Sequence, residues 1–337
     1  MAYTVKLEPS GKQFEADEAD KILDAALHQG INLPYGCRNG ACGDCKGKIL
    51  SGQVDYGDYQ PWAMDEDERA RGYALFCQAT PRSDLVLEAE EIDDARQMEV
   101  RRLPCRVHDW RQLTHDIMEV RLKLPAAERL QYLAGQYIEV ILKDGRRRAF
   151  SIANTPLQDD FLTVHIRYVP GGEFTEHIFH GLKRKEIWNF EGPLGNFYLR
   201  HSDKPALLVA GGTGLGPIKA ILETAFEEGI ERDFHLFFGV RAQRDLYLTE
   251  TLDRWQRDYP NFRWTPALSD PAPEDSDWSG DSGYLDEVIA RYFTDLSAHE
   301  GYLAGPPPMV DAVSARMREL GMVPEQLYSD AFTYSTE

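Results

Sequence analysis

Four cysteines have the spacing needed to hold a metal centre: Cys37, Cys42, Cys45 and the more distant Cys77. The first three follow the pattern C-x4-C-x2-C, which is typical of a 2Fe–2S cluster held by four thiolates. Glycines stand between them, and glycine lets the backbone wrap closely and aim N–H groups at sulfur. Zinc prefers two short-spaced cysteine pairs, and only Cys42-x2-Cys45 is such a pair, so the spacing favours the cluster over zinc.

The other cysteine and the N-terminus indicate the compartment. Cys105 begins an expected strand, and we expect it to be a small buried hydrophobic residue. Five cysteines, three of them within nine residues, do not resemble a disulfide scaffold. The first residues alternate like a strand and lack the basic-then-apolar layout of a signal peptide. We therefore expect a reducing, cytoplasmic environment, in which clustered cysteines more often hold metal.

Two segments of the middle region carry groups that could bind an anion or a ring. Arg148-Ala149-Phe150-Ser151 places a basic, an aromatic and a hydroxyl residue on one expected strand. Gly171-Gly172-Glu173-Phe174-Thr175 opens an expected helix, where free N–H groups and the helix dipole attract anions. Taken alone, the first segment is compatible with an ordinary strand and the second with a plain turn and cap.

A glycine-rich segment of the last third is placed where a phosphate cradle belongs. Gly211-Gly212-Thr213-Gly214-Leu215-Gly216-Pro217 lies between an expected buried strand and a helix. It lacks the G-x-G-x-x-G spacing, and the next strand ends in Phe238-Gly239-Val240-Arg241 without an acidic residue. Both departures argue against an ordinary NAD dehydrogenase.

The elements that must position these groups divide the chain into three parts. Residues 3–8 and 13–16 read as a hairpin, followed by a helix capped by Asp20 that ends at Gly30. After the cysteine loop come a strand at 48–50, an acidic helix near 64–71 and a strand at 85–87. The polar, aperiodic stretch 92–102 reads as a linker.

The second and third parts differ in the pattern of their apolar residues. Residues 103–200 contain alternating runs at 117–124, 137–141 and 162–168, which suggest an antiparallel barrel. From 205 onward, apolar strands at 206–210, 235–238 and 301–304 alternate with helices that end near 229 or cover 249–258 and 308–320. Such alternation predicts a parallel sheet covered on both faces.

Composition excludes several classes of function. The 337 residues include 37 Lys and Arg against 56 Asp and Glu, a net charge of -19, which argues against nucleic acid as a partner. No run approaches the ~18 apolar residues of a membrane helix, so no membrane partner is expected. Residues 1–95 hold nine basic and nineteen acidic side chains, a net charge of -10, which could steer a basic protein partner.

With these motifs in order, the chain resembles ferredoxin-fused flavoprotein reductases, which include oxygenase reductase components and the reductase of CDP-6-deoxyhexulose dehydrase. The cluster loop Leu33-Pro34-Tyr35-Gly36-Cys37-Arg38-Asn39-Gly40-Ala41-Cys42-Gly43-Asp44-Cys45 carries the likeness most clearly. The resemblance implies a multidomain fold. Its parts are a β-grasp plant-type ferredoxin domain (1–92), a linker (93–102), an antiparallel β-barrel FAD domain (103–200) and an α/β parallel-sheet NAD-binding domain (201–337), the last two ferredoxin reductase-like.

The resemblance also implies roles in flavin binding. Arg148 would hold a phosphate oxygen, Phe150 would lie along the flavin ring in place of the usual tyrosine, and Ser151 would hydrogen-bond near N5. The segment with Gly172 and Thr175 resembles the loop that binds the pyrophosphate of FAD. Asp330-Ala331-Phe332 resembles the family's terminal segment, with Phe332 close to the flavin, although a plain core phenylalanine fits that position as well. Ser151 and Phe332 are thus the candidate catalytic residues.

For the nucleotide, the likeness points to six loop residues and one determinant of specificity. The loop residues are Gly212, Thr213, Gly214, Gly216, Gly305 and Pro306. Relatives that use NADPH carry Ser-Arg where this chain has Ser269-Asp270, so Asp270 would repel the 2′-phosphate and favour NADH. The alternative is that Asp270 merely starts an acidic loop, and Arg241 and Arg244 could themselves bind that phosphate.

Taken together, the expected function is electron transfer from NADH to FAD, to the 2Fe–2S cluster and to an electron-accepting protein. The acceptor would be an oxygenase component or a dehydrase that uses pyridoxamine phosphate, and the chain would act as a monomer. Two other readings remain open at this point: a redox-sensing or carrier module with degenerate reductase domains, and a reductase of free flavin or oxygen.

Overall fold

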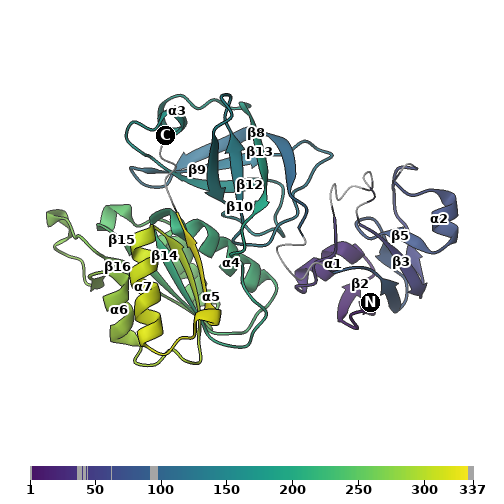
Figure 1. Cartoon of the computed structure of the whole chain (residues 1–337). Helices are drawn as coiled ribbons and strands as arrows, with labels where there is room; N and C mark the ends of the chain where they lie inside the picture. Colours follow the sequence, from purple (N-terminus) through teal and green to yellow (C-terminus); the bar gives the residue numbers. More distant parts are fainter. Residues whose placement is uncertain are drawn as a thin grey trace.

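Three large sheets, one in each domain, organise the protein, and β4 (Val54–Asp55) pairs with β6 (Thr80–Pro81) in a fourth, two-stranded sheet (Figure 1). The computed structural model describes residues 2–35, 40, 43, 45–61, 63–91 and 98–332. The N-terminal domain lies to one side of the barrel, and the C-terminal domain lies below the barrel in the view of Figure 1. Among the described residues, no helix has the length and apolar character needed to cross a membrane.

The N-terminal domain is a five-stranded sheet that grasps a helix, in the strand order β2-β1-β7-β3-β5. Its elements are β1 Ala2–Glu8, β2 Gln13–Asp17, α1 Ile22–His28, β3 Lys46–Ser51, β4 Val54–Asp55, α2 Glu66–Ala70, β5 Tyr73–Leu75, β6 Thr80–Pro81 and β7 Leu85–Glu88. The hairpin and the acidic helix are confirmed. The predicted cap of α1 is wrong, because the helix begins after Lys21 and Asp20 instead accepts a hydrogen bond from the N–H of Asp17.

The middle domain is an antiparallel barrel, as the alternating runs predict. Its elements are β8 Arg101–Gln112, β9 Ile117–Lys123, β10 Tyr137–Ile141, β11 Arg147–Ser151, β12 Leu162–Arg167, α3 Glu173–His180 and β13 Ile187–Leu194. The order is β11-β10-β13-β8-β9-β12, and a bridge between Ile152 and Val164 brings the two edges together. β8 begins at Arg101, inside the stretch that reads as a linker in the sequence.

The C-terminal domain is a parallel sheet in the order β17-β16-β15-β14-β18-β19. Its elements are β14 Ala206–Gly211, α4 Leu215–Glu227, β15 Phe234–Val240, α5 Thr249–Asp258, β16 Phe262–Leu268, β17 Asp281–Ser282, α6 Leu285–Tyr292, β18 Glu300–Gly305, α7 Pro307–Glu319 and β19 Leu327–Ala331. Short 3-10 turns cover Gly212–Gly214, Gln243–Asp245, Pro273–Asp275 and Pro324–Gln326. The chain order reverses between β14 and β18, which is where such sheets bind ligands.

Specific hydrogen bonds join the three domains. The Gln131 side chain of the barrel accepts from the N–H of Tyr35 at 3.0 Å and donates to the carbonyl of Leu33 at 2.7 Å, just before the cysteine loop. On the other side, Lys219 of α4 donates to the carbonyl of Ala153 at 2.9 Å. The barrel is therefore tied both to the N-terminal domain and to the helix that follows the glycine-rich segment.

Candidate functional site

Two of the four candidate cluster ligands lie side by side in the N-terminal core. Cys45 and Cys77 are buried and pack in the same hydrophobic cluster, and neither forms a disulfide. A hydrogen bond with Cys45 lowers the pKa of Cys77 to about 7 against the opposing effect of burial, and the backbone N–H of Gly40 lowers it further. Thiolate character and N–H donors near sulfur suit a ligand of an iron–sulfur cluster. Cys37 and Cys42 lie outside the described residues.

The backbone around these cysteines requires glycine. Gly40 has a φ of +76°, and a Cβ placed there would lie 2.9 Å from the carbonyl oxygen of Asp58. Gly43 has a φ of +91°, and its Cβ would lie 3.2 Å from the carbonyl oxygen of Ala63. At these two described positions the backbone is left-handed and closely packed, so a residue with a Cβ would be strained there.

The two candidate flavin segments lie next to each other on the barrel. β11 carries Arg148, Phe150 and Ser151, and the ring of Phe150 lies 5.7 Å from that of Phe174 in the first turn of α3. Arg148 is half-buried and donates to the carbonyl of Arg147 at 3.0 Å. A guanidinium, an aromatic face and a helix start therefore share one region, which fits a group with a ring and phosphates.

The start of α3 is shaped by a threonine. Gly172 is the N-cap residue, and no side chain caps the helix. The hydroxyl of Thr175 accepts from the N–H of Val169 at 3.1 Å, and it lies 3.0 Å from the carbonyl oxygens of Val169 and Gly172. Thr175 therefore holds the turn before the helix closed. The resulting helix start leaves backbone N–H groups uncapped, as an anion site requires.

The C-terminal segment joins the flavin strand to the nucleotide domain. The Ser151 hydroxyl donates to Asp330 Oδ2 at 3.2 Å, and the N–H of Phe332 donates to the carbonyl of Gly305 at 2.9 Å. Burial raises the pKa of Asp330 to about 6, against a smaller opposing effect of the Ser151 hydrogen bond. The sequence alone indicates no role for Asp330, because the residue to which it bonds lies 179 positions away.

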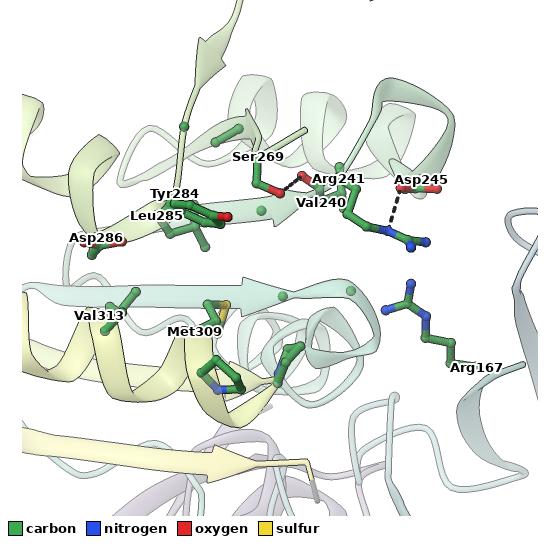
Figure 2. Close-up of a pocket in the computed structure, with 18 of the residues that line it drawn as sticks. Arg167, Val240, Arg241, Asp245, Ser269, Tyr284, Leu285, Asp286, Met309 and Val313 are labelled. Carbon is green, nitrogen blue, oxygen red and sulfur yellow. Dashed lines mark hydrogen bonds and ion pairs between the residues drawn. The ribbon is translucent and has the colours of Figure 1, made fainter. Parts of the chain in front are cut away.

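A cavity of about 770 Å³ opens at the carboxyl ends of β14, β15 and β16 (Figure 2). Of the predicted nucleotide residues, Gly212 and Pro306 line it. Arg167 and Arg241 hold their guanidinium groups at one end of the cavity, and Asp286 and Val313 lie toward the other. The glycine-rich helix start that lines the same cavity suits a dinucleotide with a diphosphate.

The other predicted loop residues support the shape of this edge. A Cβ on Gly214 would lie 1.9 Å from the carbonyl oxygen of Ala304, and one on Gly216 would lie 3.3 Å from His165 Nδ1. Gly305 has a φ of +147°, and its Cβ would meet the backbone of Gly211 at 2.9 Å. The turn that contains Thr213 therefore rests on β18. Close approach to backbone requires Gly214 and Gly305, whereas Gly216 faces side chains of the barrel.

The candidate determinant of nucleotide specificity lies beside the cavity and does not line it. Asp270 is exposed, and its backbone N–H donates to the carbonyl of Arg241 at 2.9 Å. Ser269 and the exposed Tyr284 line the cavity instead. The preceding glycine, Gly283, with a φ of +116°, is the local signal that could have drawn attention to Tyr284.

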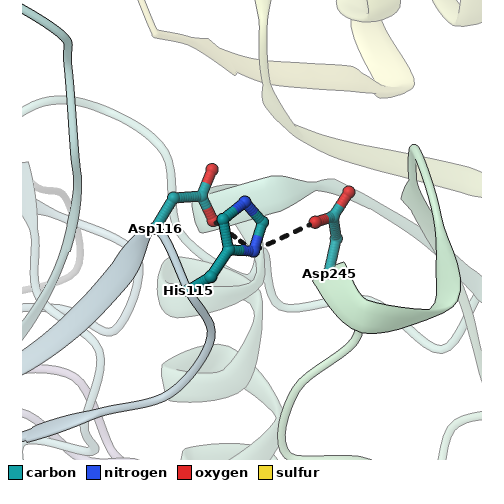
Figure 3. Close-up of side chains that lie close together, drawn as sticks. All are labelled: His115, Asp116 and Asp245. Atoms are coloured by element: carbon teal, nitrogen blue, oxygen red, sulfur yellow. Dashed lines mark ion pairs between the residues drawn. The ribbon is translucent and has the colours of Figure 1, made fainter.

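A charged group joins the barrel to the nucleotide domain at the mouth of the cavity (Figure 3). His115 Nδ1 lies 3.6 Å from Asp245 Oδ1 and 4.0 Å from Asp116 Oδ1. Arg167 Nε lies 2.9 Å from Asp116 Oδ2, and Arg241 lies within 3.7 Å of both carboxylates. The carboxylates are thus already neutralised by arginines, and the group is an ion-pair network between domains.

Three known domain families match the three parts of the chain. Residues 5–82 match the 2Fe-2S iron-sulfur cluster binding domain, residues 104–198 the oxidoreductase FAD-binding domain, and residues 208–315 the oxidoreductase NAD-binding domain. The chain thus has domains for the cluster, for FAD and for NAD, and it is an NAD(P)H-dependent oxidoreductase of the electron-transfer type.

Relatives match this chain over nearly its whole length. CDP-6-deoxy-L-threo-D-glycero-4-hexulose-3-dehydrase reductase of Yersinia pestis is 33% identical over 99% of this chain and 100% of its own length. Xylene/toluene monooxygenase electron transfer component XylA of Pseudomonas putida is 35% identical over 98% and 93%. The crystal structure of the reductase GcoB of Amycolatopsis matches with a TM-score of 0.66 and 32% identity, over 98% of this chain and 99% of that one. A ferredoxin reductase in carbazole 1,9a-dioxygenase matches with a TM-score of 0.64 and 29% identity, over 99% of both chains. This chain therefore belongs to the family of reductases in which a 2Fe–2S ferredoxin domain is fused to FAD-binding and NAD-binding domains.

Proposed function

We propose that this chain passes electrons from NADH through FAD and the 2Fe–2S cluster to a separate acceptor protein. The terminal segment carries the proposal, because Asp330 bonds to Ser151 of the flavin strand while Phe332 bonds to Gly305 of the nucleotide edge. The same few residues thus contact both candidate sites. When bound, the flavin supplies the conversion of a two-electron hydride donor into single electrons, which a 2Fe–2S cluster requires.

The proposed roles of the side chains follow from their positions. Arg148 and the start of α3 would bind the phosphates of FAD, and Phe150 would cover one face of its ring. Ser151 holds a proton donor toward Asp330 at 3.2 Å. Since burial keeps the pKa of Asp330 at about 6, this carboxyl can take up or release a proton near neutral pH beside the flavin site.

We further propose that NADH is the preferred nucleotide. Arg241 is the cation best placed to bind a 2′-phosphate at the end of β15, but its guanidinium already faces Asp116 at 3.7 Å and Asp245 at 3.6 Å. Asp270 adds another negative charge after β16. Like charges in a partly desolvated site repel, so we expect a preference for NADH of about tenfold or more in kcat/KM. Asp270→Arg should reduce that ratio; an unchanged ratio, or a wild type that prefers NADPH, would show that Asp270 has no such role.

The proposed acceptor is a protein of one of two kinds: a component of a multicomponent mono- or dioxygenase, or a CDP-6-deoxyhexulose dehydrase. The relatives serve both kinds, as their names state. The acidic charge of residues 1–95 supports docking to a basic partner through the cluster domain. Capture of the acceptor from the source cell, followed by reduction of the purified acceptor with NADH, would identify it.

The serial route is tested by separating the flavin from the cluster. Cys77→Ser or Cys42→Ser should abolish reduction of cytochrome c and leave NADH-dependent reduction of ferricyanide largely intact. Cys105→Ser is the matched control, because Cys105 is also a buried cysteine but lies in the barrel.

If both activities vanish in a folded, flavin-loaded Cys77→Ser protein, the serial route is wrong. If cytochrome c reduction survives, the chain acts as a reductase of free flavin or oxygen. Steady turnover by the wild type would exclude a carrier module with degenerate reductase domains.

A further inference from the structure

A chain of buried polar groups runs from the barrel to the glycine-rich loop. His165 of β12 has a side chain only 1% exposed, and its Nε2 lies 3.5 Å from Glu119 Oε2 of β9. Its Nδ1 lies 3.3 Å from the hydroxyl of Tyr247, which is buried and belongs to the nucleotide domain. That hydroxyl in turn donates to the carbonyl oxygen of Gly212 at 3.2 Å. None of these three side chains has a role in the function proposed above.

The hydroxyl has one proton, so its hydrogen bonds have a direction. The Glu119 carboxylate faces Nε2 at 3.5 Å, so Nε2 carries the proton of a neutral His165 ring and Nδ1 presents a lone pair. The Tyr247 hydroxyl donates to the Gly212 carbonyl at 3.2 Å, and Nδ1, 3.3 Å from that hydroxyl, is a second acceptor. The rings of His165 and Tyr247 meet edge to face at 5.5 Å, and Tyr247 also packs edge to face on Phe238 at 5.6 Å. This packing fixes the tyrosine ring, so the hydroxyl reaches the loop at a defined point.

The Gly212 carbonyl determines where the next N–H group points. The peptide bond is planar and trans, so the carbonyl of Gly212 and the N–H of Thr213 point in opposite directions. The same carbonyl also accepts from the N–H of Leu215, which directs it along the turn toward α4. The Thr213 N–H therefore points out of the open, N-terminal end of the turn, where a phosphate would bind. Gly212 has a φ of +55°, a left-handed conformation that glycine adopts without strain.

We propose that Tyr247 is a positioning residue for the nucleotide diphosphate: His165 and Phe238 hold its ring, and its hydroxyl holds the first peptide of the glycine-rich loop in its phosphate-binding direction. The proposal rests on the function proposed above, in which this loop binds NADH. It adds a link between domains, because the barrel then shapes the diphosphate site through His165. Gly216 permits this arrangement, since a Cβ there would lie 3.3 Å from His165 Nδ1.

The test compares an inhibitor that carries the diphosphate with one that lacks it. Adenosine and ADP-ribose are measured as competitive inhibitors against NADH, with ferricyanide as acceptor and the holoenzyme as catalyst. In Tyr247→Phe we expect the inhibition constant of ADP-ribose and the KM for NADH to rise about tenfold, which corresponds to the loss of one hydrogen bond. The inhibition constant of adenosine and kcat should stay within about twofold, because neither depends on the loop peptide.

Tyr302→Phe is the matched control. Tyr302 is also a buried tyrosine with a bonded hydroxyl, but its partners are Glu300 and the N–H of Arg200, so all four constants should match those of the wild type. His165→Asn removes the ring that packs on Tyr247, so the inhibition constant of ADP-ribose should rise in that variant as well. This variant tests the positioning role if Tyr247→Phe does not fold.

The possible failures are distinguishable. If ADP-ribose does not compete with NADH in the wild type, the proposed nucleotide site is wrong. If the wild type binds it and Tyr247→Phe leaves its constant within twofold, the positioning role is refuted. An equal rise for adenosine and ADP-ribose would also refute that role, because it would indicate general loosening of the domain.

Discussion

Replacing Asp330 by asparagine should stabilise the protein above pH 6 and have no effect near pH 4. In the structure Asp330 is half-buried on β19 beside Ser151, and burial raises the pKa of its carboxyl to about 6. The folded protein therefore holds this proton over a pH range in which the unfolded chain has already released it. Asparagine has a similar shape and no charge, and its side-chain oxygen can still accept from Ser151.

The sign follows from the direction of the shift. Below pH 3.8 the carboxyl is protonated in the folded and the unfolded protein alike, so it does not change the free energy of unfolding. As the pH rises from 3.8 to about 6, the unfolded chain gains by ionising while the folded one does not, so stability is lost over that window. The full gap corresponds to about 3 kcal/mol. Because solvent reaches part of the side chain, we expect about 1–2 kcal/mol for Asp330→Asn at pH 8.

The measurement is urea unfolding of wild type and variant between pH 4 and 8, followed by tryptophan fluorescence. Asp275→Asn serves as a contrast of opposite sign: Asp275 is buried, but its Oδ2 accepts from the backbone N–H groups of Gln243 and Ala272, and an amide can satisfy them less well. We expect that variant to be destabilised. An Asp330→Asn protein as stable as the wild type at every pH, or stabilised only below pH 4, would refute the reasoning.

Three further outcomes are expected. Burial opposes ionisation of Glu119, but His165 and Arg111 hold its pKa at about 2, so Glu119→Gln should cost about 2–3 kcal/mol at pH 7, and unfolding curves should show the cost shrinking as the pH falls below 4.5. Gly214→Ala should lower the free energy of unfolding by at least about 3 kcal/mol in thermal unfolding, since its Cβ would overlap the Ala304 carbonyl. Gly145 has open space and a φ of +88°, so Gly145→Ala should lower that free energy by only about 1 kcal/mol. The rate of cytochrome c reduction should fall between 0.02 and 0.5 M salt while ferricyanide reduction does not; a flat rate would mean that the charge of residues 1–95 does not steer the partner.

The features that sequence reasoning predicted well are those that a short segment determines by itself. In β12 apolar and other residues alternate, which indicates one buried face, and in β14 the apolar run is uninterrupted, which indicates two buried faces. The barrel and the parallel sheet could therefore be predicted. The glycines of the loop at 211–217 were informative for the same reason. Their positions reflect close contacts, with Gly214 against the backbone of β18 and Gly216 against side chains of the barrel.

The features that it missed depend on residues brought together by the tertiary fold. Asp330 and Tyr247 act on partners 179 and 35 or more positions away, and nothing in their local sequence indicates those partners. The cap of α1 was misplaced by one position, because Asp20 bonds within its own turn to Asp17. The role of Asp270 in nucleotide specificity is predicted from its position after the expected strand alone. In the structure Ser269 lines the cavity and Asp270 lies beside it.

The two hydrogen bonds between the Gln131 side chain and the segment before the cysteine loop have a kinetic consequence. They hold the ferredoxin domain on the barrel to which it is covalently joined, and a short tether corresponds to an effective concentration in the millimolar range. In the proposed route, the internal transfer to the cluster is then first-order and independent of how dilute the protein is. Delivery to a separate acceptor remains second-order. Dilution should therefore slow only the last step, and reduced protein should accumulate while it waits for its partner.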